Sequence, residues 1–252
     1  SLACYAAIEH FNPHALGFTE AFDGESFTLN LDAHLHGTST DNVDGTVRVE
    51  NLSIHSEEKG DLLADSLVLH SSPQDGQQHV TLQSPFLNAQ AVGHFRWQQL
   101  TGMLQQTLLS RLPGIGNGGR KTSPIATTDD IALTAHIRDT LFLARLSGKP
   151  IAIPQTSTFS ASIDGGSGMF DFHTQIPALS YGGEELRNID CHAQSNDSHT
   201  QLSLLMERQM KGAPVELGAD VRSDGDQLRG RMHWRSQSER VQMGEVDVAS
   251  TF

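Results

Sequence analysis

The stretch FTLNLDAHLH, residues 27–36, alternates without a break between apolar and polar side chains. Successive side chains of a β-strand point to opposite faces, so this pattern predicts a strand with one apolar face and one polar face. At about 3.3 Å per residue the run spans roughly 33 Å, which is long for a globular strand. The apolar positions are Phe27, Leu29, Leu31, Ala33 and Leu35. What contacts this apolar side is the question that the sequence raises.

A second alternating run follows a polar loop and changes parity once. Val47 and Val49 belong to one parity, whereas Leu52 and Ile54 belong to the other. One extra residue in a strand of an antiparallel pair produces such a change. We therefore expect a β-bulge at Glu50-Asn51 that bends the strand.

Further strand-like runs recur along the chain and leave little room for crossover helices. Turns rich in Ser, Pro, Asp and Gly separate many of them, as tight connections require. Consecutive strands with short connections favour antiparallel pairing over a βαβ sheet. The pattern predicts a mostly β protein with long antiparallel strands. The runs cover residues 67–69, 80–82, 86–93, 131–137, 159–163, 170–172, 202–206, 215–221 and 228–234.

One segment has helical periodicity, residues 95–112. Its apolar residues recur at spacings of three and four, which predicts an amphipathic helix, and Pro113-Gly114 ends it. Three roles stay open: the helix covers one end of the sheet, plugs an apolar groove, or binds a partner. The plug residues are Trp97, Leu100, Leu104 and Leu108.

A glycine-rich segment divides the chain into two predicted β-modules. Residues 116–128 lack periodicity and indicate a flexible linker, with one module at 1–115 and the other at 129–252. Gly114, Gly116 and Gly119 form a literal GxGxxG. A dinucleotide fingerprint follows a strand and opens a helix, whereas this one follows a helix and opens a loop, so we do not expect a cofactor.

Length, net charge and composition argue against several classes of function. A chain of 252 residues is long enough for a real core, and its net charge of −13 argues against nucleic acid. No apolar stretch has the length of a membrane-spanning helix, and no signal peptide opens the chain. Because the sequence starts at Ser1 within a folded pattern, we expect a fragment of a larger protein. Cys4 and Cys191 are isolated in sequence, and a bridge between them stays open.

The sequence contains only weak matches to metal-binding and catalytic motifs. Asp32, His34 and His36 share one strand face, but they occupy its polar positions and no further ligand pattern completes a metal site. GGSGMF, residues 165–170, lacks the spacing and context of a nucleophile elbow. We expect no enzyme, no catalytic residue and no bound metal.

The opening stretch has an echo near the other end of the chain. Residues 29–37 align with 215–223, and residues 41–50 align with 226–235, with a loop one residue shorter in the second copy. Both copies contain an Asp-x-aliphatic-x-Gly turn between two alternating runs. Stacked hairpins of one kind produce an elongated structure with one continuous face.

Three consecutive segments resemble the periplasmic repeats of the TamB/AsmA-like family, the translocation and assembly module proteins, in their Bacteroidetes form. They are LNLDAHLHGTSTDNVDGTVRVENLSI, DLLADSLVLHSS and HVTLQSPFLNAQAVGHFRWQQLTGMLQQTL. The succession is G-x-V-x-V-x-N-L at 45–52, a Leu-rich strand, L-x-S-P-F-x-N-A at 82–89, and G-x-F at 93–95. It covers residues 11 to 112, and the second half of the chain matches more loosely.

The resemblance implies a fold and a function. The fold is an elongated, half-open antiparallel sheet, curled into a taco-like trough with an apolar lining. The parent protein is expected in the periplasm, anchored in the inner membrane by a segment absent from this sequence. Its expected work is phospholipid transport between membranes or outer-membrane protein assembly, with phospholipid or other acyl chains and an Omp85-type protein as partners.

The alternating positions supply the residues expected to line the groove. The alternative is that the same apolar face closes on itself as a β-sandwich, a structural or protein-interaction domain with no lipid role. The groove residues are Phe27, Leu29, Leu31, Leu35, Val47, Val49, Leu67, Leu69, Val80, Leu82, Phe170, Phe172, Leu202, Leu204, Val215, Leu217, Val221, Met232 and Trp234.

Overall fold

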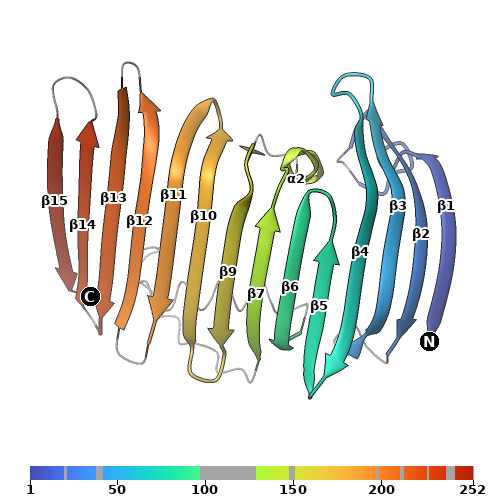
Figure 1. Ribbon diagram of the computed structural model, residues 1–252, viewed down its shortest axis with the longest axis horizontal. Coiled ribbons are helices and arrows are strands. Elements are labelled where there is room, and N and C mark those ends of the chain that lie inside the picture. The colour runs from blue at the N-terminus through green and yellow to red at the C-terminus, as the bar shows by residue number, and fades with distance from the viewer. Residues whose placement is uncertain are drawn as a thin grey trace.

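A computed structural model of the chain contains one long antiparallel sheet (Figure 1). The strands lie side by side from β1 to β15, and the two chain termini lie at opposite ends. The structure describes residues 1–19, 22–37, 42–96, 129–147, 151–196, 199–210, 213–225, 227–236 and 242–251.

The strands are longer than those of most globular sheets, as the alternating runs predict. Their bounds are β1 Leu2–Phe11, β2 Glu25–His36, β3 Asp44–Ser56, β4 Leu62–Gln74, β5 Gln77–Gln83, β6 Leu87–His94, β7 Asp130–Ile137, β8 Ile151–Ala152, β9 Ser157–Asp164, β10 Met169–Tyr181, β11 Glu184–Ser195, β12 His199–Met210, β13 Ala213–Asp224, β14 Gln227–Ser236 and β15 Met243–Thr251.

Spatial order follows chain order. Fourteen strands pair in sequence, and the short β8 pairs only with the end of β10. Two connections are two-residue hairpin turns with positive φ at both positions, Asp75-Gly76 and Gly182-Gly183. Such turns match the twist of the strands and need residues that tolerate a left-handed backbone. The mostly β, antiparallel prediction is confirmed.

The β-bulge predicted at Glu50-Asn51 is present in β3. The register of β2 and β3 shifts between the pairs Thr28–Ser53 and Asn30–Glu50, so two residues of β3 oppose one residue of β2. Asn51 lies at the shift with a φ of 54°. A positive φ is tolerated best by Gly, Asn and Asp, which explains why Asn stands here.

The two predicted modules share the sheet. β6 and β7, which lie on either side of residues 97–128 in sequence, pair directly over eight residues from Leu87–Ile137 to His94–Asp130. The apolar residues of the two halves therefore belong to one surface. The linker at 116–128 lies outside the described residues, and the division into modules stays a prediction.

The described residues include a single helix, α2, Leu141–Ser147, which the sequence patterns did not predict. Its Phe142 stacks on Phe86 with ring centroids 4.8 Å apart, and both side chains belong to a cluster with the fully buried Ile54. The predicted helix at 95–112 lies outside the described residues from position 97 on.

Candidate functional site

The strand register places one residue of each path strand in a single line across the sheet, which we call the central apolar row. Direct pairs connect every neighbour in this line, and thirteen of its fourteen members are apolar. With strands about 4.8 Å apart, the row runs roughly 60 Å along the sheet. Its members are Cys4, Ala33, Val47, Leu69, Leu82, Ala89, Ala135, Phe159, Thr174, Cys191, Leu204, Ala219, Met232 and Val246.

A second apolar row lies two residues along each strand, on the same face. Glycine and one serine are its only departures from apolar side chains. Its members are Leu2, Leu35, Gly45, Ser71, Val80, Ala91, Leu133, Ala161, Phe172, Ala193, Leu202, Val221, Gly230 and Val248.

The line between these two rows belongs to the opposite face and is polar from β2 to β15, with Ala3 as its only apolar member. Because alternate residues point to opposite sides, the sheet has one apolar face and one polar face over its whole length. The polar row is Ala3, His34, Thr46, His70, Thr81, Gln90, Thr134, Ser160, His173, His192, Ser203, Asp220, Arg231 and Asp247.

All nineteen residues predicted to line a groove have the strand parity of the apolar face. Ten of them lie in the two apolar rows, and the other nine lie further along the same face, such as Leu31 with its partner Val49 and Leu217 with its partner Trp234. The strand register therefore places all nineteen residues on one face of the sheet. What the face binds stays a prediction.

Burial varies along the apolar face. Near its middle, a cluster of side chains from β5 to β11, together with Phe95 after β6, is only 3–8% exposed, whereas the central apolar row on the same strands is half-buried. At the C-terminal end the same face is open, with Met232 56%, Trp234 40%, Val246 46% and Val248 55% exposed. The most exposed side chains of this face thus lie at its two ends, on β14 and β15 and on β1, where Leu2 is 58% exposed.

Near the N-terminal end of the sheet, a buried carboxylate connects β2 to the helix α2. Glu25, at the start of β2, is 1% exposed and accepts hydrogen bonds from Lys59 Nζ at 2.7 Å and Arg145 Nε at 3.1 Å. Arg145 also donates to the backbone oxygens of Lys59 and Gly60. This network fixes α2 to the β3–β4 turn, because a buried charge requires paired and hydrogen-bonded partners.

Two histidine–aspartate pairs on the polar face connect β10 and β11. His173 Nε2 lies 3.0 Å from Asp190 Oδ1, and His192 Nε2 lies 3.1 Å from Asp171 Oδ2. Gln175 donates to Asp190 Oδ2 at 3.0 Å. This hydrogen bond, with smaller contributions from His173 and His192, holds the pKa of Asp190 below its ordinary value.

The thiol of Cys191 lies in the central apolar row, on the other face of β11. Its partial burial, and secondly the charge of the adjacent Asp190, raise the pKa of the thiol above its ordinary value. Cys191 and Cys4 are both free thiols. The bridge that the sequence left open is absent between these two described residues.

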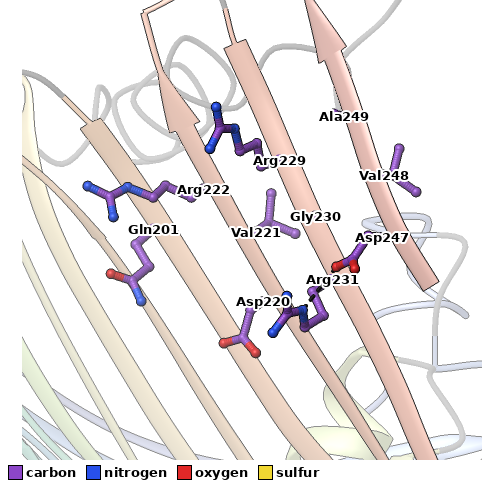
Figure 2. A pocket seen from close by; sticks show the side chains of 10 residues that line it. All are labelled: Gln201, Asp220, Val221, Arg222, Arg229, Gly230, Arg231, Asp247, Val248 and Ala249. Carbon is purple, nitrogen blue, oxygen red and sulfur yellow. Dashed lines mark hydrogen bonds and ion pairs between the residues drawn. The ribbon is translucent and has the colours of Figure 1, made fainter. Parts of the chain in front are cut away.

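A shallow hollow on β12–β15 is lined by several charged side chains (Figure 2). Arg231 Nε lies 2.9 Å from Asp247 Oδ1, and this hydrogen bond raises the pKa of the guanidinium above its ordinary value. Arg222 and Arg229 oppose each other in the register, with Gln201 next in line on β12. The hollow borders β15, the last strand of the sheet.

The residues considered for chemistry are solvent-facing. His34 Nε2 lies 3.0 Å from Asp32 Oδ1, and both side chains are about half exposed or more. Within the described ranges, no group of three or more His, Cys, Asp or Glu side chains is placed to hold a metal ion.

The GGSGMF segment belongs to the turn between β9 and β10. Asp164 accepts hydrogen bonds there from the hydroxyl and backbone of Ser167 and from the backbone of Gly166, which lower the pKa of the carboxyl. Its role in the structure is that of a turn residue.

Several features of this surface escaped the sequence analysis. β1, β11 and β15 were not predicted, although β11 and β15 have partial alternation and complete the apolar rows at Ala193 and Val248. Nothing in the sequence connects Glu25 with Arg145, which is 120 positions away. The proposed plug residues Trp97, Leu100, Leu104 and Leu108 lie outside the described part of the chain.

In the parts of the chain that the structure describes, no helix has the length and hydropathy to cross a membrane. No family model, no curated protein and no solved structure matches the chain. The face itself therefore carries the functional argument.

Proposed function

We propose that the apolar face binds acyl chains and that phospholipid is its cargo. The observation that supports this is the pair of apolar rows that extends from β1 to β15. An acyl chain of about 14 buried methylenes, at about 0.8 kcal/mol each, loses roughly 11 kcal/mol of favourable burial in water. A carrier needs a dry surface of comparable length, and a long row of Leu, Val, Ala and Phe provides one.

The face acts as a surface along which an acyl chain lies parallel to the rows. In the proposed arrangement the sheet curls into the half-open, taco-like trough that the TamB/AsmA-like resemblance implies, with the polar row in water. The exposed side chains of β14 and β15 make first contact, because a cluster of side chains near the middle of the face is already buried.

The cellular role of the chain follows from the same resemblance. We place it in the periplasm, as part of a protein anchored in the inner membrane that moves phospholipid between membranes or assists outer-membrane protein assembly. An Omp85-type protein is the proposed partner of the parent. The net charge of −13 supports acyl-chain binding over attraction to anionic headgroups, because a negative chain is repelled by an anionic lipid surface.

A specific observation favours a second function, that of a structural or protein-interaction domain without a lipid role. The central cluster, with Val80 5% and Ala193 3% exposed, is already closed to solvent. A face that is filled by the chain's own side chains offers no room there. The two functions differ in whether the folded protein holds acyl chains.

Native mass spectrometry of the purified chain, with solvent extraction and lipid analysis, tests the proposal. The variant Met232→Asp places a charge in the central apolar row, and His233→Asp places the same charge on the adjacent residue of the opposite face. Lipid binding lowered about tenfold in Met232→Asp and retained in His233→Asp supports the proposal. A folded protein that takes up no phospholipid, or equal effects of the two variants, refutes it.

A further inference from the structure

Two arginines lie opposite each other in the hollow on β12–β15. Arg222 of β13 and Arg229 of β14 are direct register partners on the polar face, and both side chains are exposed. β13 and β14 each pair with described strands on both sides, so this position is interior to the sheet. In the described part of the chain, neither guanidinium forms an ion pair with an acidic side chain. Two positive charges thus face each other without a described acidic partner.

Acidic side chains around the hollow lie close to a third arginine. Asp220 opposes Arg231 in the register. Arg231 Nε also lies 2.9 Å from Asp247 Oδ1 and 3.3 Å from Glu245 Oε1. Neighbouring carboxylates therefore compensate the charge of this guanidinium. Among the described residues, the hollow contains one arginine with acidic partners and two arginines without them.

The neighbours of this pair in the same row across the sheet are neutral. Gln201 of β12 opposes Arg222, and Ala249 of β15 opposes Arg229 (Figure 2). The amide of a glutamine side chain donates hydrogen bonds, and an alanine side chain is too short to fill the space beside a guanidinium. The hollow has a volume of about 660 Å³, within the size range of small-molecule sites. The two arginines therefore border an open space that has a further donor next to it.

The repulsion between Arg222 and Arg229 favours an anion between them, because like charges directly opposite each other destabilise a strand pair. A guanidinium stays protonated in proteins, so loss of a proton cannot relieve the repulsion. A bound anion relieves it. A phosphate dianion matches the pair, because it brings two negative charges and its oxygens accept the paired N–H groups of each guanidinium.

We propose that Arg222 and Arg229 together bind a phosphate group, with the side-chain amide of Gln201 as a further donor. The site lies on the polar face, so it goes beyond the acyl-chain binding proposed for the opposite face. Inorganic phosphate and a phospholipid headgroup offer the same chemistry, and the experiment separates these two sources. Both arginines are exposed, and Asp224 lies two residues from Arg222 on the same face of β13. We therefore expect a weak site, with a dissociation constant of about 1 mM.

Thermal unfolding measures the binding, because a ligand that binds only the folded state raises the thermal midpoint. The purified chain is compared in sodium phosphate and in sodium chloride of equal ionic strength, at mildly alkaline pH, where phosphate is mostly a dianion. Phosphate also stabilises proteins by exclusion from their surface, so the rise is taken relative to that of variants without the site. At about ten times the dissociation constant, we expect bound phosphate to contribute a rise of about 3 °C. In an NMR titration with phosphate, the Nε–Hε signals of Arg222 and Arg229 should shift and saturate.

Arg222→Gln combined with Arg229→Gln removes the site. We expect phosphate to bind this double variant at least about tenfold more weakly, so that the contribution of bound phosphate to the midpoint disappears. In chloride the double variant should unfold at an equal or higher temperature than the unmodified protein, because it lacks the repulsion between the strands. The matched control combines Arg187→Gln with Arg208→Gln, which removes two charges that already have acidic partners at 2.7 Å and 2.8 Å. The control should keep the full rise in phosphate.

Sedimentation with phosphatidylglycerol vesicles separates the two sources of the phosphate group. Vesicles that sediment the unmodified protein, but not the double variant at Arg222 and Arg229, assign a lipid headgroup to the site. A rise of the midpoint in phosphate without such sedimentation assigns a soluble phosphate. Either result supports the site.

Three results overturn the proposal. An equal rise in the unmodified protein and the double variant shows a general salt effect, and an equal loss in the double variant and the control shows an effect of net charge. The third is a titration in which the signals of Arg222 and Arg229 do not move. The lipid assay reads the opposite face through Met232→Asp, so failure of one proposal leaves the other standing.

Discussion

The hairpins β2–β3 and β13–β14 have the same sequence pattern, but their apolar side chains differ in burial. The alignment of residues 29–37 with 215–223 equates Leu31 with Leu217, and the structure pairs these residues with the aligned Val49 and Trp234. Yet Val49 is half-buried, whereas Trp234 is 40% exposed and its neighbour Met232 56%. Alternation specifies a strand and its apolar face, but it does not specify whether anything covers that face.

What covers the N-terminal hairpin is assembled from distant parts of the chain. Ile54 near the end of β3 packs with Phe86 and Phe142, and Arg145 of α2 reaches Glu25 at the start of β2. No helix occupies the corresponding place at the C-terminal hairpin among the described residues. The first hairpin is therefore part of a core, and the second is a surface.

The two hairpins should differ most in how much stability they lose when one apolar side chain of each is truncated. Ile54 is 0% exposed, so Ile54→Ala leaves a cavity and should lower the free energy of unfolding by about 3–4 kcal/mol. Met232→Ala removes an exposed side chain and should change it by less than about 0.5 kcal/mol. Urea unfolding followed by circular dichroism measures both. Similar losses in the two variants would show that the C-terminal hairpin is covered in solution.

The buried carboxylate gives the next largest effect. Arg145→Met leaves Glu25 with Lys59 as its remaining ion-pair partner and should lower the free energy of unfolding by about 2–4 kcal/mol. Adding Glu25→Gln should restore part of the loss, because it removes the uncompensated charge. The exposed counterpart Arg231→Met should leave the urea midpoint unchanged. No recovery in the double variant would contradict the buried-charge explanation.

The apolar face could be predicted from the sequence more completely than the tertiary contacts that cover part of it. Period-two alternation identified most of the long strands, and the parity change located the bulge at Asn51. β1 was not predicted because AAIEHF alternates poorly between apolar and polar residues. α2 was not predicted because seven residues are too few to show a helical period. The contact of Glu25 with Arg145 depends on tertiary proximity, which no local pattern encodes.

Two aligned glycines give a smaller and sharper test of the repeat. Gly45 has a φ of 148°, and a Cβ there would clash with the backbone oxygen of His34, so Gly45→Ala should cost about 2–3 kcal/mol. A Cβ at its counterpart Gly230 would make an ordinary van der Waals contact, 3.9 Å from Val221 Cγ2. Gly230→Ala should be neutral or stabilise by up to about 1 kcal/mol. Equal effects on the urea midpoint would mean that the two hairpins share their backbone geometry as well as their pattern.

The smallest effect should come from Asp190, on β11 between the two hairpins. Its folded pKa is depressed, chiefly by the hydrogen bond from Gln175, so its contribution to stability is present above the unfolded pKa of about 3.9 and is lost as the pH falls through the folded pKa. The thermal midpoints of the unmodified protein and Asp190→Asn should therefore differ at pH 7 and converge in acid, below about pH 4. Gln175→Ala should reduce the difference while it keeps the carboxylate. A gap between the midpoints that widens in acid would reverse the sign and assign the pH dependence to another group.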